Sequence, residues 1–178
     1  SIAQVHFAKI KSSNTEIDVA VKVLRPEIEK IINQEMERLE WLTTFMENFT
    51  EFQRLRPNSI IKKAKEVIKF ELDLRYEAAA ASELSENTNM DESFYVPKVY
   101  WDKVTQKILT MEKIIGVPAD KIDELNEKKV NKKQAAENLI INFLRQSIRD
   151  GYFHADLHQG NLFLNPKGKL LAVDFGIM

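Results

Sequence analysis

The chain has 178 residues, and its 26 basic and 27 acidic side chains leave a formal net charge of −1. With 44% hydrophobic and 30% charged residues it has a globular composition, which argues against wholesale disorder, and the charge balance argues against a dedicated nucleic-acid binder. The absence of cysteine excludes disulfides, thiolate metal sites and a cysteine nucleophile. The longest stretch without Asp, Glu, Lys or Arg, 157–166, has about half the length of a membrane-spanning helix, and no signal-peptide pattern opens the chain.

The first segments predict a β-hairpin followed by two helices. Apolar and polar residues alternate over 2–10, residues 19–24 are mostly β-branched and apolar, and turn-forming residues lie between them. Pro26 suits the first turn of a helix whose apolar residues keep helical spacing to Met46. Pro57 ends this pattern, and we expect one longer helix from about residue 58 or 59 to about 86.

The second half of the chain predicts two pairs of strands around a third helix. The strands are expected at 95–101 and 107–114, and at 161–164 and 170–173. The helix is expected from Lys132 to Asp150, ended by Gly151. Its residues predicted to face inward are Ala135, Leu139, Ile140, Phe143, Leu144 and Ile148. Strands in antiparallel-type pairs separated by helices predict an α+β fold rather than a parallel βαβ sheet, with a seam near 116–123.

The densest polar cluster is the sequence HADLHQGN at 154–161. Asn161 follows Asp156 by five residues, and Asp174 follows it by eighteen, in a DFG sequence after the predicted strands. The oxygen atoms of Asn161 and Asp174 suit Mg²⁺, which usually keeps substrate phosphates among its ligands. Asp156 then stays free to orient or deprotonate a nucleophile, and this arrangement is the one that phosphoryl transfer needs.

The two histidines of this cluster have an alternative interpretation. His154 and His158 are four residues apart and could ligate zinc, but no helix, thiolate or HExxH context accompanies them. We therefore assign His154 to bracing the loop.

The N-terminal half supplies a lysine and three candidate carboxylates. Lys22 lies among apolar residues of a predicted strand, so it is expected to pair with a carboxylate. On the long predicted helix, Glu71 falls in the middle of the apolar stripe, where an ionised carboxylate must find a cation. Asp73 suits a solvated face, and Glu77 is compatible with either environment.

Six segments together resemble a known family. They are SIAQVH at 1–6, VAVKVLRP at 19–26, ELD at 71–73 with Glu77-Ala78, Met111-Glu112, HADLHQGN at 154–161 and DFG at 174–176. Over the whole chain they resemble the UbiB/AarF family of atypical kinases, the ABC-one-like family. The resemblance implies a protein-kinase-like two-lobed fold, with residues 1–115 as the small lobe and 116–178 as part of the helical lobe. It also implies truncation at both ends, because the chain starts within the family's nucleotide loop and stops at the DFG.

The resemblance implies roles for individual residues. Lys22 matches the phosphate-binding lysine, Glu77 matches its helix partner, and Asp156 matches the catalytic-loop Asp. These three are the expected catalytic residues. Asn161 and Asp174 match the metal ligands. The further nucleotide-site candidates are Ala3, Val5, Ala20, Met111 and Glu112, with Glu71 and Asp73 of the family's ExD motif. The family's KxGQ motif, the partner of ExD, is absent from this chain, and Leu157 and Gln159 stand where members often carry proline.

The family further implies ATP and Mg²⁺ binding, ATPase or small-molecule kinase activity, and support of ubiquinone biosynthesis. The expected partners are ATP, a lipid or polyprenyl-phenol precursor and ubiquinone-biosynthesis proteins, with no nucleic acid. The full-length parent is expected on the cytoplasmic or organelle-matrix side, peripheral to a membrane. Residues 54–69 carry six basic residues and one acid, which suits either acidic lipid headgroups or a solvated helix face.

Two other functions compete with this interpretation. Aminoglycoside- or choline-kinase-like phosphotransferases also use an HxDxxxxN motif and a later Asp. A pseudokinase would bind nucleotide as a scaffold without turnover. The intact Lys22, Asp156, Asn161 and Asp174 argue against a pseudokinase.

Overall fold

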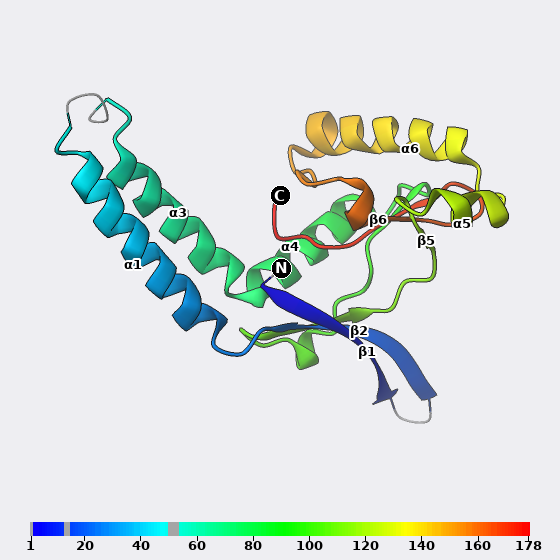
Figure 1. Ribbon diagram of the computed structural model, residues 1–178. Helices are drawn as coiled ribbons and strands as arrows, with labels where there is room; N and C mark the ends of the chain where they lie inside the picture. Colours follow the sequence, from blue (N-terminus) through cyan, green and yellow to red (C-terminus); the bar gives the residue numbers. More distant parts are fainter. Residues whose placement is uncertain (1, 13–14, 50–53) are drawn as a thin grey trace.

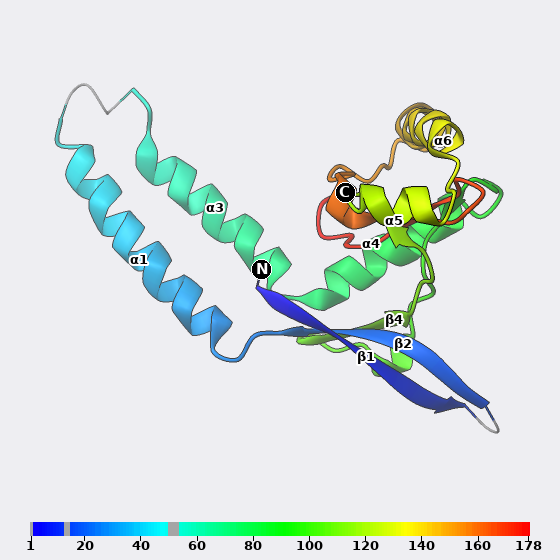
Figure 2. The same ribbon diagram turned by 45° about the vertical axis from the view of Figure 1, so that its right-hand side comes forward.

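The computed structural model describes residues 2–12, 15–49 and 54–178. Its first sheet is antiparallel, in the order β1-β2-β4, and consists of β1 (Ala3–Ser12), β2 (Thr15–Leu24) and β4 (Ile108–Glu112). The predicted β-hairpin is therefore confirmed as β1 and β2, except that part of its turn, residues 13–14, lies outside the described residues. β1 and β2 form a long hairpin (Figure 1), and β4 adds to the free side of β2 (Figure 2).

Two antiparallel helices, α1 (Ile28–Met46) and α3 (Pro57–Glu71), project from one end of this sheet as a helical hairpin (Figure 2). They are joined across the hairpin by an ion pair of 2.7 Å between Lys65 and Glu40. The basic stretch 54–69 lies in and just before α3, and its side chains are mostly exposed or half-buried. Within the described ranges, none of the helices combines the length and hydropathy that crossing a bilayer requires.

The single long helix predicted up to residue 86 is wrong, because α3 ends at Glu71 and a separate helix, α4 (Leu74–Asn87), follows. Asp73 causes the break. Its backbone is extended, and its side chain accepts a hydrogen bond from the backbone N–H of Arg75, which makes Asp73 the N-cap of α4. An Asp at this position satisfies an N–H group that lacks a partner within the helix, so a new helix starts in a different direction.

The second sheet has the order β3-β7-β6-β5. Its strands are β3 (Phe94–Tyr95), β5 (Val117–Pro118), β6 (Leu162–Leu164) and β7 (Leu170–Ala172). The hairpin of β6 and β7 is as predicted. The strand expected at 95–101 is not continuous: β3 at its start pairs in parallel with β7, and after β3 only an isolated bridge joins Val99 to Met111. Pro97 lacks a backbone N–H and so interrupts a continuous ladder.

The predicted position of the third helix is confirmed, but the prediction of which of its sides faces inward is wrong. α6 (Lys132–Leu144) continues into a π-helical turn, η2 (Arg145–Asp150), and Gly151 ends it with φ of +64°. Of the residues predicted to face inward, Ala135 is buried and Leu139 partly buried. The other four are exposed, namely Ile140, Phe143, Leu144 and Ile148. The buried face carries the polar side chains of Asn138, Asn142 and Gln146.

Hydrogen bonds to residues distant in sequence explain this reversal. The Asn138 side chain donates to the carbonyl of Gly168 at 2.8 Å, and the Asn142 side chain donates to the hydroxyl of Ser93 at 2.9 Å. Because the N–H groups of these amides bond to loops of the second sheet, part of the cost of burying them is offset. A short helix before α6, α5 (Ile122–Glu127), was not predicted from the sequence.

One hydrophobic cluster runs through both sheets and is joined by α4, which lies above the first sheet in Figure 1. α4 contributes its buried face, β4 contributes Leu109 and Met111, and Phe175 lies beyond β7 with 1% of its surface exposed. Since α4 carries Glu77 and β2 carries Lys22, this packing brings the two side chains together.

Candidate functional site

The centre of the site is an ion pair between a strand and a helix. Lys22 on β2 places its Nζ atom 2.7 and 2.8 Å from the two carboxylate oxygens of Glu77 on α4. Nζ is also 3.1 Å from Oδ1 of Asp174, which lies just after β7. The Lys22 and Glu77 side chains are 15% and 7% exposed, so the pair is shielded from water, whereas Asp174 is half exposed.

The charges around Lys22 determine its protonation. Burial lowers the pKa of Lys22, but the charges and hydrogen bonds of Glu77 and Asp174 outweigh burial and hold this pKa above its ordinary value. Burial raises the pKa of Glu77, and the positive charge of Lys22 offsets this only in part. Lys22 therefore stays a cation at neutral pH, held between two carboxylates.

The loop 154–161 places Asp156 and Asn161 side by side. The side-chain amide of Asn161 donates to the carbonyl of Asp156 at 3.1 Å and to its Oδ2 at 3.2 Å. The carbonyl of Asn161 accepts from the N–H of Val173 at 2.9 Å, which ties the loop to the end of β7. Asp156 has a half-exposed side chain, while Asn161 is buried.

His154 is buried and holds this loop in place, as expected. Its Nδ1 accepts the N–H of Asp156 at 3.2 Å, and its Nε2 lies 3.4 Å from the carbonyl of Val173. Burial lowers the pKa of His154, so the ring is neutral and Nε2 carries the hydrogen. Both ring nitrogens are thus engaged, which removes the basis for His154 as a zinc ligand.

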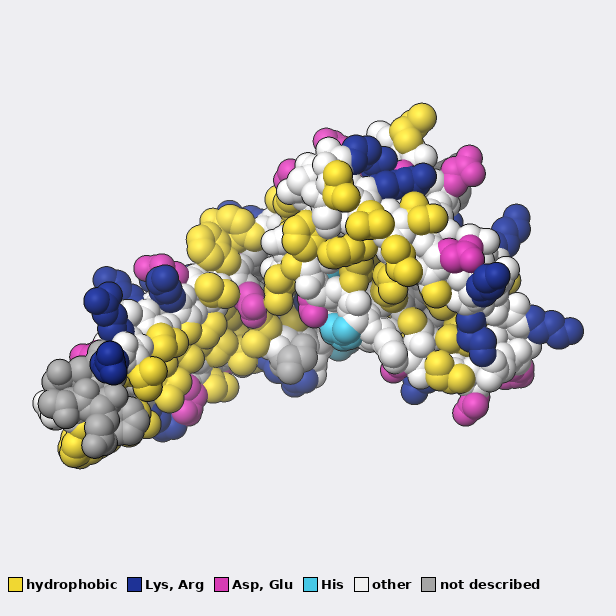
Figure 3. Space-filling view, turned by 90° about the horizontal axis from the view of Figure 1, so that it is seen from above, with side chains coloured by type: hydrophobic (Ala, Val, Ile, Leu, Met, Phe, Trp, Pro, Cys, Tyr) yellow, Lys and Arg dark blue, Asp and Glu magenta, His cyan; other side chains and the backbone are white. Residues whose placement is uncertain are grey.

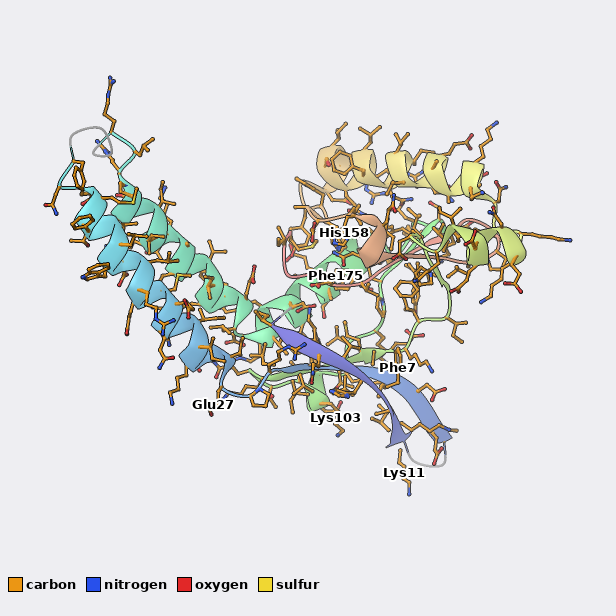
Figure 4. The ribbon with its side chains drawn as sticks, in the orientation of Figure 1. Phe7, Lys11, Glu27, Lys103, His158 and Phe175 are labelled. Atoms are coloured by element: carbon orange, nitrogen blue, oxygen red, sulfur yellow. The ribbon has the colours of Figure 1, made fainter. Side chains whose placement is uncertain are left out.

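Asp174 adopts φ of +64°, a backbone conformation that non-glycine residues rarely take and that often marks a functional site. The N–H of Phe175 lies 3.4 Å from Oε1 of Glu77, and the Phe175 ring packs on His154 with centroids 5.5 Å apart. In the view of Figure 4, His158 and Phe175 lie below α6, on the side toward the first sheet. Among the described residues, no group of three or more His, Cys, Asp or Glu side chains is arranged to hold a metal ion.

Lys22, Glu77, Asp156 and Asp174 line one cavity of about 480 Å³. Its charged lining residues are Lys22, Glu71, Asp73, Glu77, Asp156 and Asp174. Its apolar lining includes Ile2, Phe70, Tyr76, Ile177 and Met178. Acidic side chains and a histidine gather on this face between the projecting hairpin and the rest of the molecule (Figure 3). Asn161 is not part of this lining, although it holds Asp156, which is.

The environments of Glu71 and Asp73 are the reverse of those predicted. Glu71 is exposed, whereas Asp73 is 8% exposed and pairs with Arg75 at 2.6 Å. The hydrogen bond from the Arg75 side chain is the main reason that the pKa of Asp73 lies below its ordinary value. The prediction assumed one helix with one apolar stripe, and the break at Asp73 invalidates that assumption.

The strand register places four of the nucleotide-site candidates on the face of the first sheet that carries Lys22. Val5 lies opposite Lys22, Ala20 lies opposite Met111, and Ala3 lies two residues before Val5. Side chains two residues apart share a face of a sheet. Glu112 follows Met111 and so belongs to the other face, where its carboxylate accepts hydrogen bonds from the Tyr95 hydroxyl and the Lys98 N–H.

Comparison with known proteins agrees with this geometry. The ABC1 atypical kinase-like domain matches residues 1–178. The chain belongs to the ABC1 atypical kinase-like family. Two curated relatives named probable protein kinase UbiB, from Pseudomonas paraeruginosa and Pseudomonas aeruginosa, are each 38% identical over 183 residues, which cover 100% of this chain and 34% of theirs. The chain thus spans about a third of the length of these relatives.

A solved structure supports the fold. The structure of Rv3197 from Mycobacterium tuberculosis in complex with erythromycin superposes with a TM-score of 0.75 at 26% identity, over 99% of this chain and 43% of that one. The α+β, kinase-like fold expected from the sequence is therefore confirmed for this ABC1 chain.

Several contacts elsewhere in this chain have no signal in the sequence. Asp91 is buried and binds Arg145 at 3.0 Å and Arg149 at 2.8 Å, which joins the segment after α4 to the π-helical turn. Phe7, exposed on β1, receives the Lys113 ammonium 4.8 Å from its ring centroid. Gln146 bonds to the backbone of His154. These partners lie far apart in sequence or lack a motif, so spacing alone does not reveal them.

Proposed function

We propose that the cavity binds ATP with Mg²⁺ and that the protein is an ATP-dependent phosphotransferase or ATPase of the UbiB type. The observation that carries this proposal is the position of Lys22, held between Glu77 and Asp174 in the cavity that Asp156 also lines. Phosphoryl transfer needs a fixed cation on the nucleotide phosphates and a carboxylate near the acceptor, and this cavity contains both. Family membership supports the same conclusion.

The donor set suits Mg²⁺. Asp174 offers a half-exposed carboxylate, and Asn161, whose amide nitrogen is engaged with Asp156, offers its amide oxygen. Hard oxygen ligands of this kind are those that Mg²⁺ prefers. When bound, the ion would supply positive charge that neutralises the phosphate oxygens.

The remaining roles follow from the contacts. Lys22 would bind the phosphates, and Glu77 would fix its position. Asp156 has Oδ2 bonded to Asn161, which leaves Oδ1 to accept a proton from the attacking hydroxyl or water. The sheet face formed by Ala3, Val5, Ala20 and Met111 would contact the adenine, and 58% of the Val5 surface is available for that contact. Glu112 would contribute through its backbone, and Glu71 and Asp73 would lie at the cavity wall.

The acceptor that we propose is a lipid or polyprenyl-phenol precursor, either phosphorylated or handled with the energy of ATP hydrolysis in ubiquinone biosynthesis. The apolar residues at the cavity wall, among them Phe70 and Tyr76, support an acceptor with an apolar body. Such a substrate resides in a membrane, so we propose that the full-length protein is peripheral to one, on its cytoplasmic or organelle-matrix side, and contacts other ubiquinone-biosynthesis proteins.

The first test is Asp174→Ala. Glu77 still holds Lys22 in this variant, so the fold is expected to persist. The Mg²⁺-dependent part of ATP affinity should fall about tenfold or more, equal to 1.4 kcal/mol or more. Titration of a fluorescent ATP analogue with and without Mg²⁺ measures it, with Asp102→Ala, an exposed carboxylate paired to Lys103, as the control. Unchanged Mg²⁺-dependent binding would refute the proposed function.

The second test separates the competing functions. Phosphate release is measured with a protein of the length of its curated relatives, with and without liposomes and a polyprenyl phenol. Stimulation by the phenol supports the proposal. A phosphorylated aminoglycoside or choline supports the small-molecule kinase instead, and ATP binding without turnover under every condition identifies a scaffold.

A further inference from the structure

Gln146 lies in the π-helical turn η2 with a fully buried side chain. Its Oε1 accepts the backbone N–H of His154 at 3.2 Å, and its own carbonyl accepts the N–H of Tyr152 at 3.2 Å. One residue of the α6–η2 segment therefore holds two points of the chain just before Asp156. π-helical turns often occur at functional sites, because the wider turn redirects side chains.

His154 extends this connection to the site. Its ring accepts the N–H of Asp156 at 3.2 Å and packs against Phe175, which is next to Asp174. The contacts thus run from Gln146 to His154, and from His154 both to Asp156 and to Phe175 beside Asp174. Outside the loop 154–161, the other described contacts of His154 are with residues 173–175 after β7, so Gln146 supplies its link to the α6–η2 segment.

We propose that Gln146 is a positioning residue for the catalytic loop. By fixing the backbone of His154 it sets the place of the imidazole, and the imidazole sets the backbone of Asp156. Gln146 does not line the cavity, and its side chain acts through His154. This inference rests on the proposed function, in which Asp156 is the catalytic carboxylate.

Gln146→Leu tests the inference without a large loss of packing. The Nε2 atom of Gln146 is buried and has no hydrogen-bond partner among the described residues, so a side chain of similar size removes an unsatisfied donor along with the acceptor for His154. We expect amide hydrogen exchange at His154 and Asp156 to become about tenfold faster, and kcat to fall about tenfold with ATP affinity unchanged. Near pH 5 a buried carboxyl is neutral and keeps its acceptor oxygen, so exchange in Gln146→Glu should be slower than in Gln146→Leu at the same pH and close to that of the parent chain.

Asn142→Leu is the matched control. Asn142 lies one helical turn earlier on the same buried face, also has an unpartnered amide atom, and makes no hydrogen bond to the catalytic loop. It should change thermal stability as Gln146→Leu does but leave exchange at His154 and kcat unchanged. Unchanged exchange at His154 in Gln146→Leu overturns the inference, and so does fast exchange in that variant with a normal kcat. An equal loss of kcat in Asn142→Leu overturns it as well. Exchange is measured on the chain without nucleotide, so its result stands even if the proposed activity is not found.

Discussion

Removal of the Glu77 carboxylate leaves Lys22 with Asp174 as its remaining ion-pair partner. Breaking a buried pair from one side typically costs about 3–5 kcal/mol, because the other charge stays buried. Lys22 is 15% exposed and keeps Asp174 at 3.1 Å, so the cost is expected to fall at or just below the bottom of this range. We therefore expect Glu77→Ala to reduce the free energy of unfolding by about 2–3 kcal/mol, which for a chain of this size lowers Tm by about 5–10 °C.

Urea unfolding followed by circular dichroism measures this loss, and nucleotide titration measures its effect on the site. Glu83→Ala, which removes an exposed carboxylate from the same helix, should stay within about 0.5 kcal/mol of the parent chain. The double variant Lys22→Met with Glu77→Leu should recover most of the lost stability, because apolar side chains of similar volume often replace a buried ion pair without cost. It should nevertheless bind no ATP.

Two results would contradict this reasoning. A loss below about 1 kcal/mol in Glu77→Ala would mean that Lys22 is well solvated without Glu77. A double variant less stable than Glu77→Ala would mean that the cost arises from packing rather than from the uncompensated charge. The ion pairs of Lys22 should also stop stabilising the fold at high pH, because Lys22 then loses its charge. Since the pKa of Lys22 is raised, this contribution to stability is present at neutral pH and is lost as the pH rises through the raised pKa, above 10.5.

Two further predictions concern His154 and Asp73. Burial lowers the pKa of His154 below 6.5, so between 6.5 and the lowered pKa the unfolded chain binds a proton that the folded chain does not. The free energy of unfolding should therefore fall by up to about 1.4 kcal/mol per pH unit as the pH drops through this range. Urea unfolding between pH 7.5 and 5 measures this slope, which should flatten in His154→Gln; an equal slope in that variant would assign it to other groups. Asp73→Ala removes the N-cap of α4 and should cost about 1 kcal/mol, whereas Asp73→Asn, which keeps the cap, should cost less than half of that. Equal losses in both would instead point to the ion pair with Arg75.

The sequence predicted local elements well where one pattern governs them. The alternation of apolar and polar residues over 2–10 predicted a strand where β1 lies, and the apolar run at 19–24 falls within β2. Gly151 ends the third helix as expected. The β6–β7 hairpin followed from its turn residues. These features depend on neighbours in the chain, so composition and spacing suffice to predict them.

Predictions about burial were less successful, because burial depends on distant partners. The exposed side of α6 is apolar and its buried side polar, since Gly168 and Ser93 supply hydrogen bonds to the buried amides. The apolar stripe expected through Glu71 ends where Asp73 caps a new helix. In both regions the periodicity was correct locally, and the orientation was decided by contacts from elsewhere.

The residue pattern is enough to show which groups are available: a lysine on an apolar strand, Asp156 and Asn161 five residues apart, and an Asp-Phe-Gly after a hairpin. Residue reasoning alone left Glu77 open and favoured Glu71 as the carboxylate that needs a cation. The pairing follows from the fold, because the break at Asp73 gives α4 a direction in which Glu77 packs against β2, across 55 residues of sequence. The free energy that selects Glu77 comes from burying α4 on the first sheet, and no local spacing encodes that contact.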